Sequence, residues 1–461
     1  MTNKNWQQPV TTGNTYILDI ENLGHSGEGV GRFENFTVFV PYALPGEQVK
    51  VRIETVKKNY AAGRLLEIVK VSPARIEPRC PVFYQCGGCQ LQHLDYVSQL
   101  AVKRQTVMNA VTRIGKLAGI TVHPTLGADN PWFYRNKMQY PVGLLKGETA
   151  VGCYAQGTHE IIETETCFIQ NEINNSIARQ VKELAAAMKI PVYNETTGRG
   201  VLRHVLGRVG TATGEVMVVL VTATEELPQS DKLVAALRGK IPGLVSVIQN
   251  VNSKRNNVIL GSHSRTLWGQ DTIADRLSDF TFRISARSFF QVNTVQAEKL
   301  YNQALEYAGL SLQDVAIDAY CGTGTITLFL AKQAARVYGI EVVPESIEDA
   351  RLNARHNGVS NVEFFVGDAV EVMPKLFRQG IRPKTVVVDP PRAGCAPKVL
   401  ETFAAMEPER IVYVSCNPSS LARDLALLAD SGYLAAEIQP VDMFPNTYHV
   451  EAIALLQRRT T

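Results

Sequence analysis

Apolar segments alternate with helical patterns along the last third of the chain. Five short apolar runs are typical of buried strands, and longer stretches with helical spacing separate them; the runs are VAIDAY (315–320), RVYGIE (336–341), VEFFVG (362–367), KTVVVDP (384–390) and RIVYVSC (410–416). This alternation predicts an α/β fold with a doubly wound parallel sheet over residues 286–461. Ligands of such sheets bind at the carboxyl ends of the strands, so the residues after each run are the first candidates for a site.

The N-terminal segment has a different pattern. Residues 11–70 contain about five β-rich runs between turns, which predicts a small OB-like β-barrel. Residues 48–80 carry eight Lys or Arg and three acids, whereas residues 10–47 carry one Arg and five acids. A basic half on a small barrel indicates a nucleic-acid platform, and lysines that protect an exposed sheet edge are the alternative.

Between these parts, a helical pattern over residues 96–114 is followed by mixed strands and helices up to residue 285. We therefore predict three domains, which are a barrel over residues 1–72, a central mixed α/β domain over 73–285 with a cysteine cluster, and the doubly wound domain over 286–461.

The composition narrows the class of protein. Hydrophobic residues make up 45% and charged residues 20% of the 461 residues, which suits packed domains and excludes a largely disordered chain. The net charge of +3 excludes a histone-like polycation but allows a local basic surface. No apolar run approaches the roughly 18 residues of a membrane span, and the polar N-terminus does not resemble a signal peptide. With eight cysteines and no export signal, we expect a cytoplasmic chain with reduced thiols and no membrane partner.

Acidic residues follow four of the apolar runs. Asp318 and Glu341 close the first two, Asp368 follows the third, and Asp389 follows the fourth. Gly322 lies in the turn after Asp318, where a residue without a side chain lets a ligand approach the backbone. Each acid alone could be a helix cap, but four in register, without a phosphate-binding GK[ST] sequence, predict a site for S-adenosylmethionine.

Cys416 ends the fifth run and precedes a helical stretch, and Glu451 lies in an apolar run near the C-terminus. A buried structural cysteine and a satisfied strand acid are the alternatives for these two residues. A helix N-terminus lowers the pKa of a thiol, so the position of Cys416 predicts a nucleophile. Carbon 5 of a pyrimidine attacks a methyl donor only after a thiolate has added to carbon 6, and a base must then remove the carbon 5 proton. Cys416 and Glu451 suit these two roles.

The predicted central domain contains a group of cysteines. Cys80, Cys86 and Cys89 are closely spaced, and Cys167 follows at a distance, which predicts a metal or iron–sulfur site. Cys153 is a rival for the fourth position, and the spacing leaves zinc and iron–sulfur open.

Together these motifs resemble those of the S-adenosylmethionine-dependent RNA uracil-5-methyltransferases. The likeness covers nearly the whole chain and rests on the barrel, similar to a TRAM domain, the cysteine pattern, and five further motifs; these are SFFQVN (288–293), DAYCGTG (318–324), VVVDPPRAG (386–394), YVSCNPSSLARD (413–424) and HVEAI (449–453). The resemblance implies a Rossmann-like class I methyltransferase domain and a [4Fe–4S] cluster with Cys167, within ETCFIQ, as its fourth ligand.

The resemblance also implies roles for individual residues. Cys416 corresponds to the nucleophile and Glu451 to the base. The expected cofactor-binding residues are Gln291, Asp318, Tyr320, Gly322, Thr325, Glu341, Asp368 and Asp389.

Members of this family with both a barrel and a cysteine cluster resemble the 23S ribosomal RNA branch, so the expected substrate is a flipped-out uridine in a loop of 23S rRNA, bound by a monomer. A tRNA uracil-5-methyltransferase is one alternative, and a non-enzymatic RNA-binding assembly factor is another. A cytosine-5 RNA methyltransferase would carry a Pro-Cys motif after the fourth run, where this chain has Asp389-Pro390-Pro391-Arg392. An amine methyltransferase would carry an aromatic residue in place of Arg392 and would leave Cys416 without a role.

Overall fold

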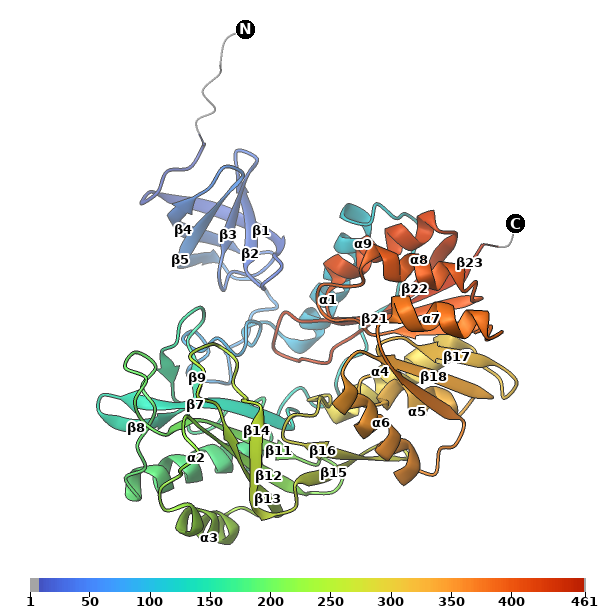
Figure 1. Ribbon diagram of the computed structural model, residues 1–461. Coiled ribbons are helices and arrows are strands. Elements are labelled where there is room, and N and C mark those ends of the chain that lie inside the picture. Colours follow the sequence, from blue (N-terminus) through green and yellow to red (C-terminus); the bar gives the residue numbers. More distant parts are fainter. Residues whose placement is uncertain (1–7, 460–461) are drawn as a thin grey trace.

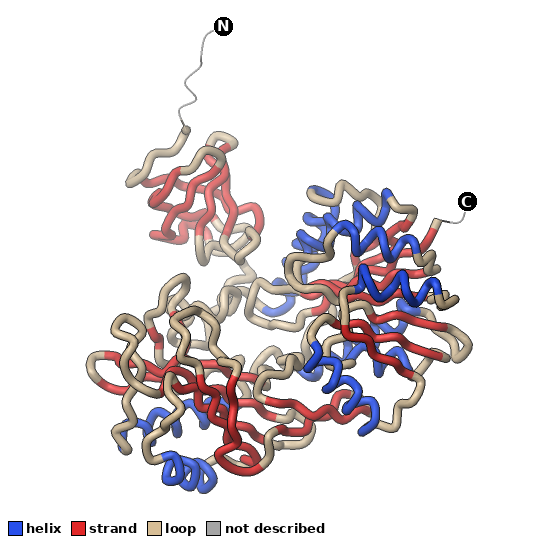
Figure 2. Tube along the Cα trace, in the orientation of Figure 1, coloured by secondary structure: helices blue, strands red, loops and turns tan. Residues whose placement is uncertain are grey.

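The computed structural model describes residues 8–459, which form an N-terminal barrel, a central α/β part and a C-terminal α/β part. In Figure 1 the barrel lies at the top, the central part at the lower left and the C-terminal part at the right. Figure 2 shows that helices cover both the central and the C-terminal sheets, whereas the barrel consists of strands and turns. None of the helices in the described part of the chain is long and apolar enough to cross a membrane.

The predicted barrel is confirmed as a closed five-stranded sheet. Its order around the barrel is β1 (Thr15–Leu23), β2 (Gly29–Phe33), β3 (Phe36–Val40), β5 (Tyr60–Lys70) and β4 (Gln48–Val56). Inward and outward side chains alternate along β4, where Val49, Val51 and Ile53 fill the interior. Closure leaves the small sheet without a free edge.

The central part is built on a six-stranded sheet. Its order is β14 (His263–Gly269), β13 (Leu244–Val251), β12 (Val216–Thr222), β11 (Leu202–Val209), β7 (Lys137–Leu145) and β8 (Glu148–Val151). Two helices and two hairpins complete it; these are α2 (Glu172–Ala187), α3 (Ser230–Lys240), β9 (Cys153–Tyr154) with β10 (Ile161–Ile162), and β15 (Thr272–Leu277) with β16 (Phe280–Ser285). Every residue of β11 and β12 is buried, because one apolar face packs on α2 and α3 and the other joins a core shared with the C-terminal part.

The C-terminal part contains the predicted doubly wound sheet. Its strand order is β19 (Val362–Val366), β18 (Arg336–Glu341), β17 (Val315–Asp318), β20 (Thr385–Val388), β21 (Arg410–Ser415), β23 (Glu451–Arg458), β22 (Tyr433–Val441) and β6 (Thr121–Val122). The first five strands are parallel, and β23 runs antiparallel to both neighbours. The helices of this part are α4 (Thr294–Ala308), α5 (Thr325–Ala331), α6 (Pro344–His356), α7 (Ala369–Arg378), α8 (Pro397–Ala405) and α9 (Pro418–Asp430).

One segment before residue 286 packs against the C-terminal sheet. Helix α1 (Tyr96–Arg113) contacts α9, and β6 extends the sheet by pairing with β22. Val107, Val111 and Val122 are buried in the same apolar cluster as the strands of the C-terminal part. The boundaries at residues 72 and 285 remain predictions. The segment 96–122 contributes a helix and a strand to the C-terminal part before the chain enters the central sheet.

Candidate active site

Four neighbouring parallel strands carry predicted site residues at their carboxyl ends. Glu341 is the last residue of β18 and Asp318 the last of β17, while Asp389 directly follows β20 and Cys416 directly follows β21. These strands are adjacent in the order β18–β17–β20–β21. The four side chains therefore lie along one edge of the sheet, where doubly wound folds bind their ligands.

Asp318 is fully buried behind the glycine turn. Its Oδ2 accepts a hydrogen bond of 2.7 Å from the Thr327 hydroxyl, and its Oδ1 has no partner in the described residues. Burial raises the pKa of Asp318 to about 7, and the nearby Asp389 and Glu341 carboxylates add to the shift. A buried carboxylate oxygen without a donor is costly, so this position suits a ligand that supplies a donor or a positive charge.

The turn after Asp318 leaves room for a ligand next to the backbone. Gly322 has a φ of +52°, a conformation that favours glycine, and a side chain there would meet no atom within 4 Å. Its N–H donates to Glu341 Oε2 at 3.3 Å, while Glu341 Oε1 accepts the N–H of Val343 at 3.0 Å. Thr325 begins α5 at the end of this turn. Backbone N–H groups from the glycine turn and from the segment after β18 thus orient the Glu341 carboxylate.

The remaining predicted cofactor residues differ in their settings. Tyr320 is half-buried, and burial together with the neighbouring Cys395 raises its pKa. Gln291 is buried just before α4, and its backbone carbonyl accepts a hydrogen bond of 2.9 Å from Asn136 of the central part. Asp368 caps α7, since its Oδ1 accepts the N–H of Val370 at 2.9 Å. The capping role that the sequence left open for these acids is therefore present at Asp368.

Cys416 and Glu451 come from paired strands. Ser415 of β21 pairs with Ala452 of β23 in antiparallel register, so the residue after Ser415 and the residue before Ala452 lie at the same end of this pair. Glu451 is 5% exposed, whereas Cys416 is partly exposed. The structure thus brings together the predicted nucleophile and base, which are 35 residues apart in the sequence.

The prediction of an acidic thiol at Cys416 is wrong. Burial, together with the carboxylates of Glu451 and Asp389, raises the pKa of Cys416 to about 11, while Arg392 opposes the shift. Burial and Asp389 likewise raise the pKa of Glu451, against the effect of Arg392. The position before a helix is outweighed because burial of the thiol and the two neighbouring carboxylates disfavour a further negative charge.

The thiol opens into a small cavity of about 70 Å³. Its walls come from distant parts of the chain; they are His25, Thr106, Arg392, Cys416, Asn417, Pro418, Tyr448, His449 and Val450. Arg392 is exposed at this cavity, and its backbone carbonyl accepts a hydrogen bond of 3.0 Å from the Asn417 side chain. The cavity therefore combines a thiol, a cation and aromatic rings. Glu451 directly follows Val450, which is one of its wall residues.

The other predicted cysteines line a second, larger cavity of about 410 Å³. Cys80, Cys86, Cys89 and Cys167 all contribute to its wall, and so does the rival Cys153. Within residues 8–459, no group of three or more His, Cys, Asp or Glu side chains is arranged so that it could hold a metal ion. The donor types and the shared cavity agree with the sequence prediction, but the identity of the group stays a prediction.

Comparison with known proteins decides the family. The family model for tRNA (uracil-5-)-methyltransferases matches residues 209–459, and the model for the TRAM domain matches residues 9–66. An RNA methyltransferase of Halalkalibacterium halodurans is 51% identical over 451 residues, covering 98% of each chain, and one of Clostridium acetobutylicum is 49% identical over 452 residues, again covering 98% of each.

The chain belongs to the tRNA (uracil-5-)-methyltransferase family.

A solved structure of the same kind is the tRNA (uracil-54, C5)-methyltransferase of Pyrococcus abyssi in complex with S-adenosyl-L-homocysteine. It is similar to this chain with a TM-score of 0.77 and 30% identity, covering 96% of this chain and all of that one. These matches confirm the resemblance, the TRAM barrel and an S-adenosylmethionine-dependent RNA methyltransferase. They also show that the combined build of barrel, central part and methyltransferase part occurs in a tRNA enzyme.

The sequence reasoning missed a buried polar network of this methyltransferase. Lys103 of α1 is 1% exposed and its Nζ contacts Oδ1 of the fully buried Asp442 at 2.5 Å. Nζ also donates to the Phe444 carbonyl at 3.0 Å, and Tyr96 donates to Asp442 Oδ2 at 2.9 Å. Asp442 begins the segment 442–450 that joins β22 to β23, called here the β22–β23 loop, and this loop leads directly into Glu451.

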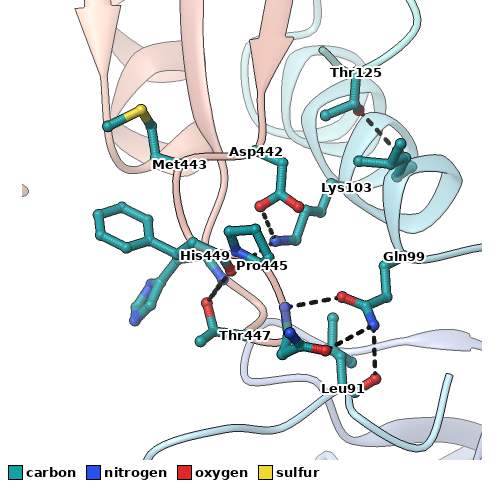
Figure 3. Close-up of polar contacts among 12 residues, drawn as sticks. Leu91, Gln99, Lys103, Thr125, Asp442, Met443, Pro445, Thr447 and His449 are labelled. Atoms are coloured by element: carbon teal, nitrogen blue, oxygen red, sulfur yellow. Dashed lines mark hydrogen bonds and ion pairs between the residues drawn. The ribbon is translucent and has the colours of Figure 1, made fainter. Parts of the chain in front are cut away.

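Figure 3 shows the contacts between α1 and this loop. Gln99, four residues before Lys103, accepts the N–H of Asn446 at 3.0 Å and donates to the Leu91 carbonyl at 3.0 Å. The N–H groups of Gln90 and Leu91, just after Cys89, donate to the Asn446 carbonyl at 3.1 and 3.0 Å. No local signal in the sequence could have found this network, because its two halves are about 340 residues apart.

Proposed function

We propose that the protein methylates carbon 5 of a uridine in 23S ribosomal RNA, with Cys416 as the nucleophile and Glu451 as the base. The observation that carries this proposal is the antiparallel pair β21–β23, which brings a thiol and a buried carboxylate together beside the cofactor edge of the sheet. A methyltransferase that acts on an amine or a hydroxyl needs no thiol, because such acceptors already have a lone pair.

The proposed steps balance in atoms and charge. The thiol proton of Cys416 leaves to solvent as sulfur bonds to carbon 6, and the electron pair of the carbon 5–carbon 6 double bond moves toward the carbonyl as an enolate. Carbon 5 then bonds to the methyl group as the methyl–sulfur bond of S-adenosylmethionine breaks, which leaves S-adenosylhomocysteine. Glu451 takes the carbon 5 proton, the sulfur–carbon 6 bond breaks, and the double bond returns.

The charges around the thiol suit this order of events. Two carboxylates oppose ionisation of Cys416, so a free thiolate is rare until positive charge arrives. The sulfonium of S-adenosylmethionine is such a charge, and Arg392 at the cavity is another, suited to the developing enolate. The raised pKa of Glu451 also suits a group that must accept a proton from carbon and release it afterwards.

S-adenosylmethionine is proposed to lie along the edge formed by β18, β17 and β20. Glu341 would accept hydrogen bonds from ribose hydroxyls, the unpaired Asp318 oxygen would receive a donor, and Asp389 would face the sulfonium side. Gly322 leaves the space through which the cofactor approaches the backbone. Further contacts are proposed for Gln291, Tyr320 and Thr325, while Asp368 acts at least as the cap of α7.

For the second cavity we propose a [4Fe–4S] cluster held by Cys80, Cys86, Cys89 and Cys167. The support for this proposal is that all four thiols line one cavity of about 410 Å³, together with the resemblance of the cysteine pattern. Such a cluster would link the segment that carries Cys80, Cys86 and Cys89 to Cys167 in the central part. No step of the methyl transfer is assigned to it.

The proposed substrate is a flipped-out uridine in a loop of 23S rRNA, bound by a monomer in the cytoplasm. The combination of barrel and cysteines supports this branch, as does the basic part of the barrel between residues 48 and 80. Transfer RNA is the second candidate, because the Pyrococcus tRNA enzyme is similar over 96% of this chain.

The deciding experiment is mass mapping of 5-methyluridine in ribosomal RNA and tRNA after incubation with the enzyme and labelled S-adenosylmethionine. Label at one uridine or a pair of uridines in 23S rRNA is expected. Label confined to tRNA would favour the second candidate, and absence of label from every uridine would exclude both. The Cys416→Ala variant serves as the control, since it must abolish the label.

A further inference from the structure

The barrel contributes a wall to the cavity of the nucleophile. His25, in the turn between β1 and β2, lines the same cavity as Cys416. Its ring centroid lies 6.0 Å from that of Tyr448, and the Tyr448 ring lies 4.1 Å from that of His449. Three aromatic rings from two distant segments thus lead from the thiol toward the barrel.

The same barrel turn packs closely on the β22–β23 loop. Gly27 has a φ of +86°, and a Cβ there would lie 3.2 Å from Cβ of Gln90 and 3.4 Å from Cβ of Tyr448. Only a residue that tolerates this conformation and leaves this space allows such an approach. The turn between β1 and β2 is therefore a direct contact between the barrel and the β22–β23 loop.

A third cavity, of about 380 Å³, lies on the barrel side of this contact and is called here the barrel cavity. Its aromatic walls include Phe39 of β3 and Tyr60 of β5, whose ring centroids are 5.5 Å apart with planes at 77°. Tyr60 is 41% exposed, so part of its ring is open to a ligand. The side chains of Gln90 and Gln156 reach the cavity from outside the barrel.

The chemistry of the barrel cavity selects a flat and uncharged ligand. Its lining contains one acid, Glu28, whose carboxylate already accepts the N–H of Ser26 at 2.9 Å within the turn. The other polar side chains of the lining include the amides of Gln90 and Gln156, which both donate and accept hydrogen bonds. Aromatic rings for stacking, with amides beside them, match an unpaired nucleobase.

We propose that the barrel cavity and the rings of His25 and Tyr448 form a subsite for unpaired nucleotides that flank the target uridine. This inference rests on the proposed function, because a base at Cys416 would place its neighbours on the barrel side of Tyr448. The RNA then runs from the thiol, across His25 and Tyr448, to a base stacked on the exposed part of the Tyr60 ring, beside Phe39. The barrel acts as a specificity element of the active site, in addition to any electrostatic role.

The test uses an oligouridylate of about ten nucleotides with one 2-aminopurine, whose fluorescence falls when the base stacks on an aromatic ring. Binding is measured with S-adenosylhomocysteine present, so that no methyl group is transferred. The variants are Tyr60→Leu and His25→Leu, and the matched control is Leu66→Ala on the same strand β5, where the side chain is 46% exposed outside the cavity.

Loss of one stacking ring is expected to weaken binding by about five- to 150-fold and to relieve the quenching at one probe position. The salt dependence should not change, because no cation is removed, and Leu66→Ala should bind like the parent. Affinities of Tyr60→Leu and His25→Leu within twofold of the parent, with unchanged quenching, would overturn the subsite. This readout does not depend on catalysis, so a failure to methylate uridine would count against the proposed function alone.

Discussion

The buried pair Lys103–Asp442 offers a sharp test of what holds the active-site loop. Lys103→Met removes the cation and leaves Asp442, which is fully buried, with the Tyr96 hydroxyl as its one side-chain donor within residues 8–459. Breaking a buried ion pair costs about 3–5 kcal/mol, mainly because the remaining charge is left uncompensated. This cost includes the lost hydrogen bond to the Phe444 carbonyl. Because Asp442 keeps its hydrogen bond from Tyr96, we expect a cost in the lower half of that range.

A double variant separates the charge from the packing. In Lys103→Met, Asp442→Asn, no buried charge remains and the hydroxyl of Tyr96 keeps a partner, so most of the lost stability should return. The surface pair Lys299–Asp129, with side chains 33% and 89% exposed, supplies the control, because Lys299→Met should cost less than about 1 kcal/mol.

The free energy of opening is measured by native-state amide hydrogen exchange of α1, the β22–β23 loop and β23, since a chain of several domains has no single unfolding free energy. A loss below about 1 kcal/mol in Lys103→Met would refute the argument that the buried charge dominates. A double variant as unstable as the single one would show that packing, and not the uncompensated charge, is responsible.

Further outcomes follow from the site. Glu451→Gln should accumulate a methylated enzyme–RNA adduct that survives denaturing gels and disappears when Cys416 is also replaced by Ala; parental turnover would remove Glu451 from the mechanism. Asp318→Ala and Glu341→Ala should each weaken S-adenosylmethionine binding by about 1.5–3 kcal/mol in calorimetry, whereas Cys416→Ala should leave it nearly unchanged; an equal loss there would mean a structural cysteine. Because burial and Asp389 raise the pKa of Glu451, its basic form appears as pH rises, so the rate of adduct release in single-turnover gels should increase with a midpoint above the ordinary carboxyl range; a midpoint near 4.5 would contradict this. Anaerobically purified protein should be brown with a broad visible absorption, and Cys86→Ser should lose it; stoichiometric zinc without iron would exclude the cluster.

The sequence predicted those parts of the protein in which local pattern and position in the fold coincide. Strands that alternate with helices determine a doubly wound sheet, and the sheet in turn determines that the residues after its strands meet at one edge. Asp318, Glu341, Asp389 and Cys416 could therefore be placed together before any coordinates were known. The barrel was predictable for a similar reason, since its strands are short, alternating and separated by turns.

Properties that depend on distant neighbours could not be predicted in this way. The thiol of Cys416 was expected to be acidic from its place before α9, but burial and the carboxylates that follow β20 and begin β23 raise its pKa. In the sequence, His25 is simply a turn residue. It reaches the Cys416 cavity because the neighbouring Gly27 packs on the β22–β23 loop. The burial of Lys103 has no local signal in the sequence, because its partner is 339 residues away.

The placement of α1 and β6 has a consequence for how the chain folds during synthesis. Val122 of β6 pairs with Ile438 of β22, so the ribosome must add more than 300 residues before this early strand can find its place. Until then the apolar face of α1 has no partner, and a chain stalled after the central part would present it to chaperones and proteases. A fragment that starts at residue 286 would leave β22 as an open edge and α9 without its covering helix, so it should aggregate even though it includes Cys416, Glu451 and every proposed cofactor-binding residue. The pairing of β22 with β6 and its contact with α1 thus join segments that are made more than 300 residues apart, and Lys103 of the early segment holds the loop that leads to Glu451.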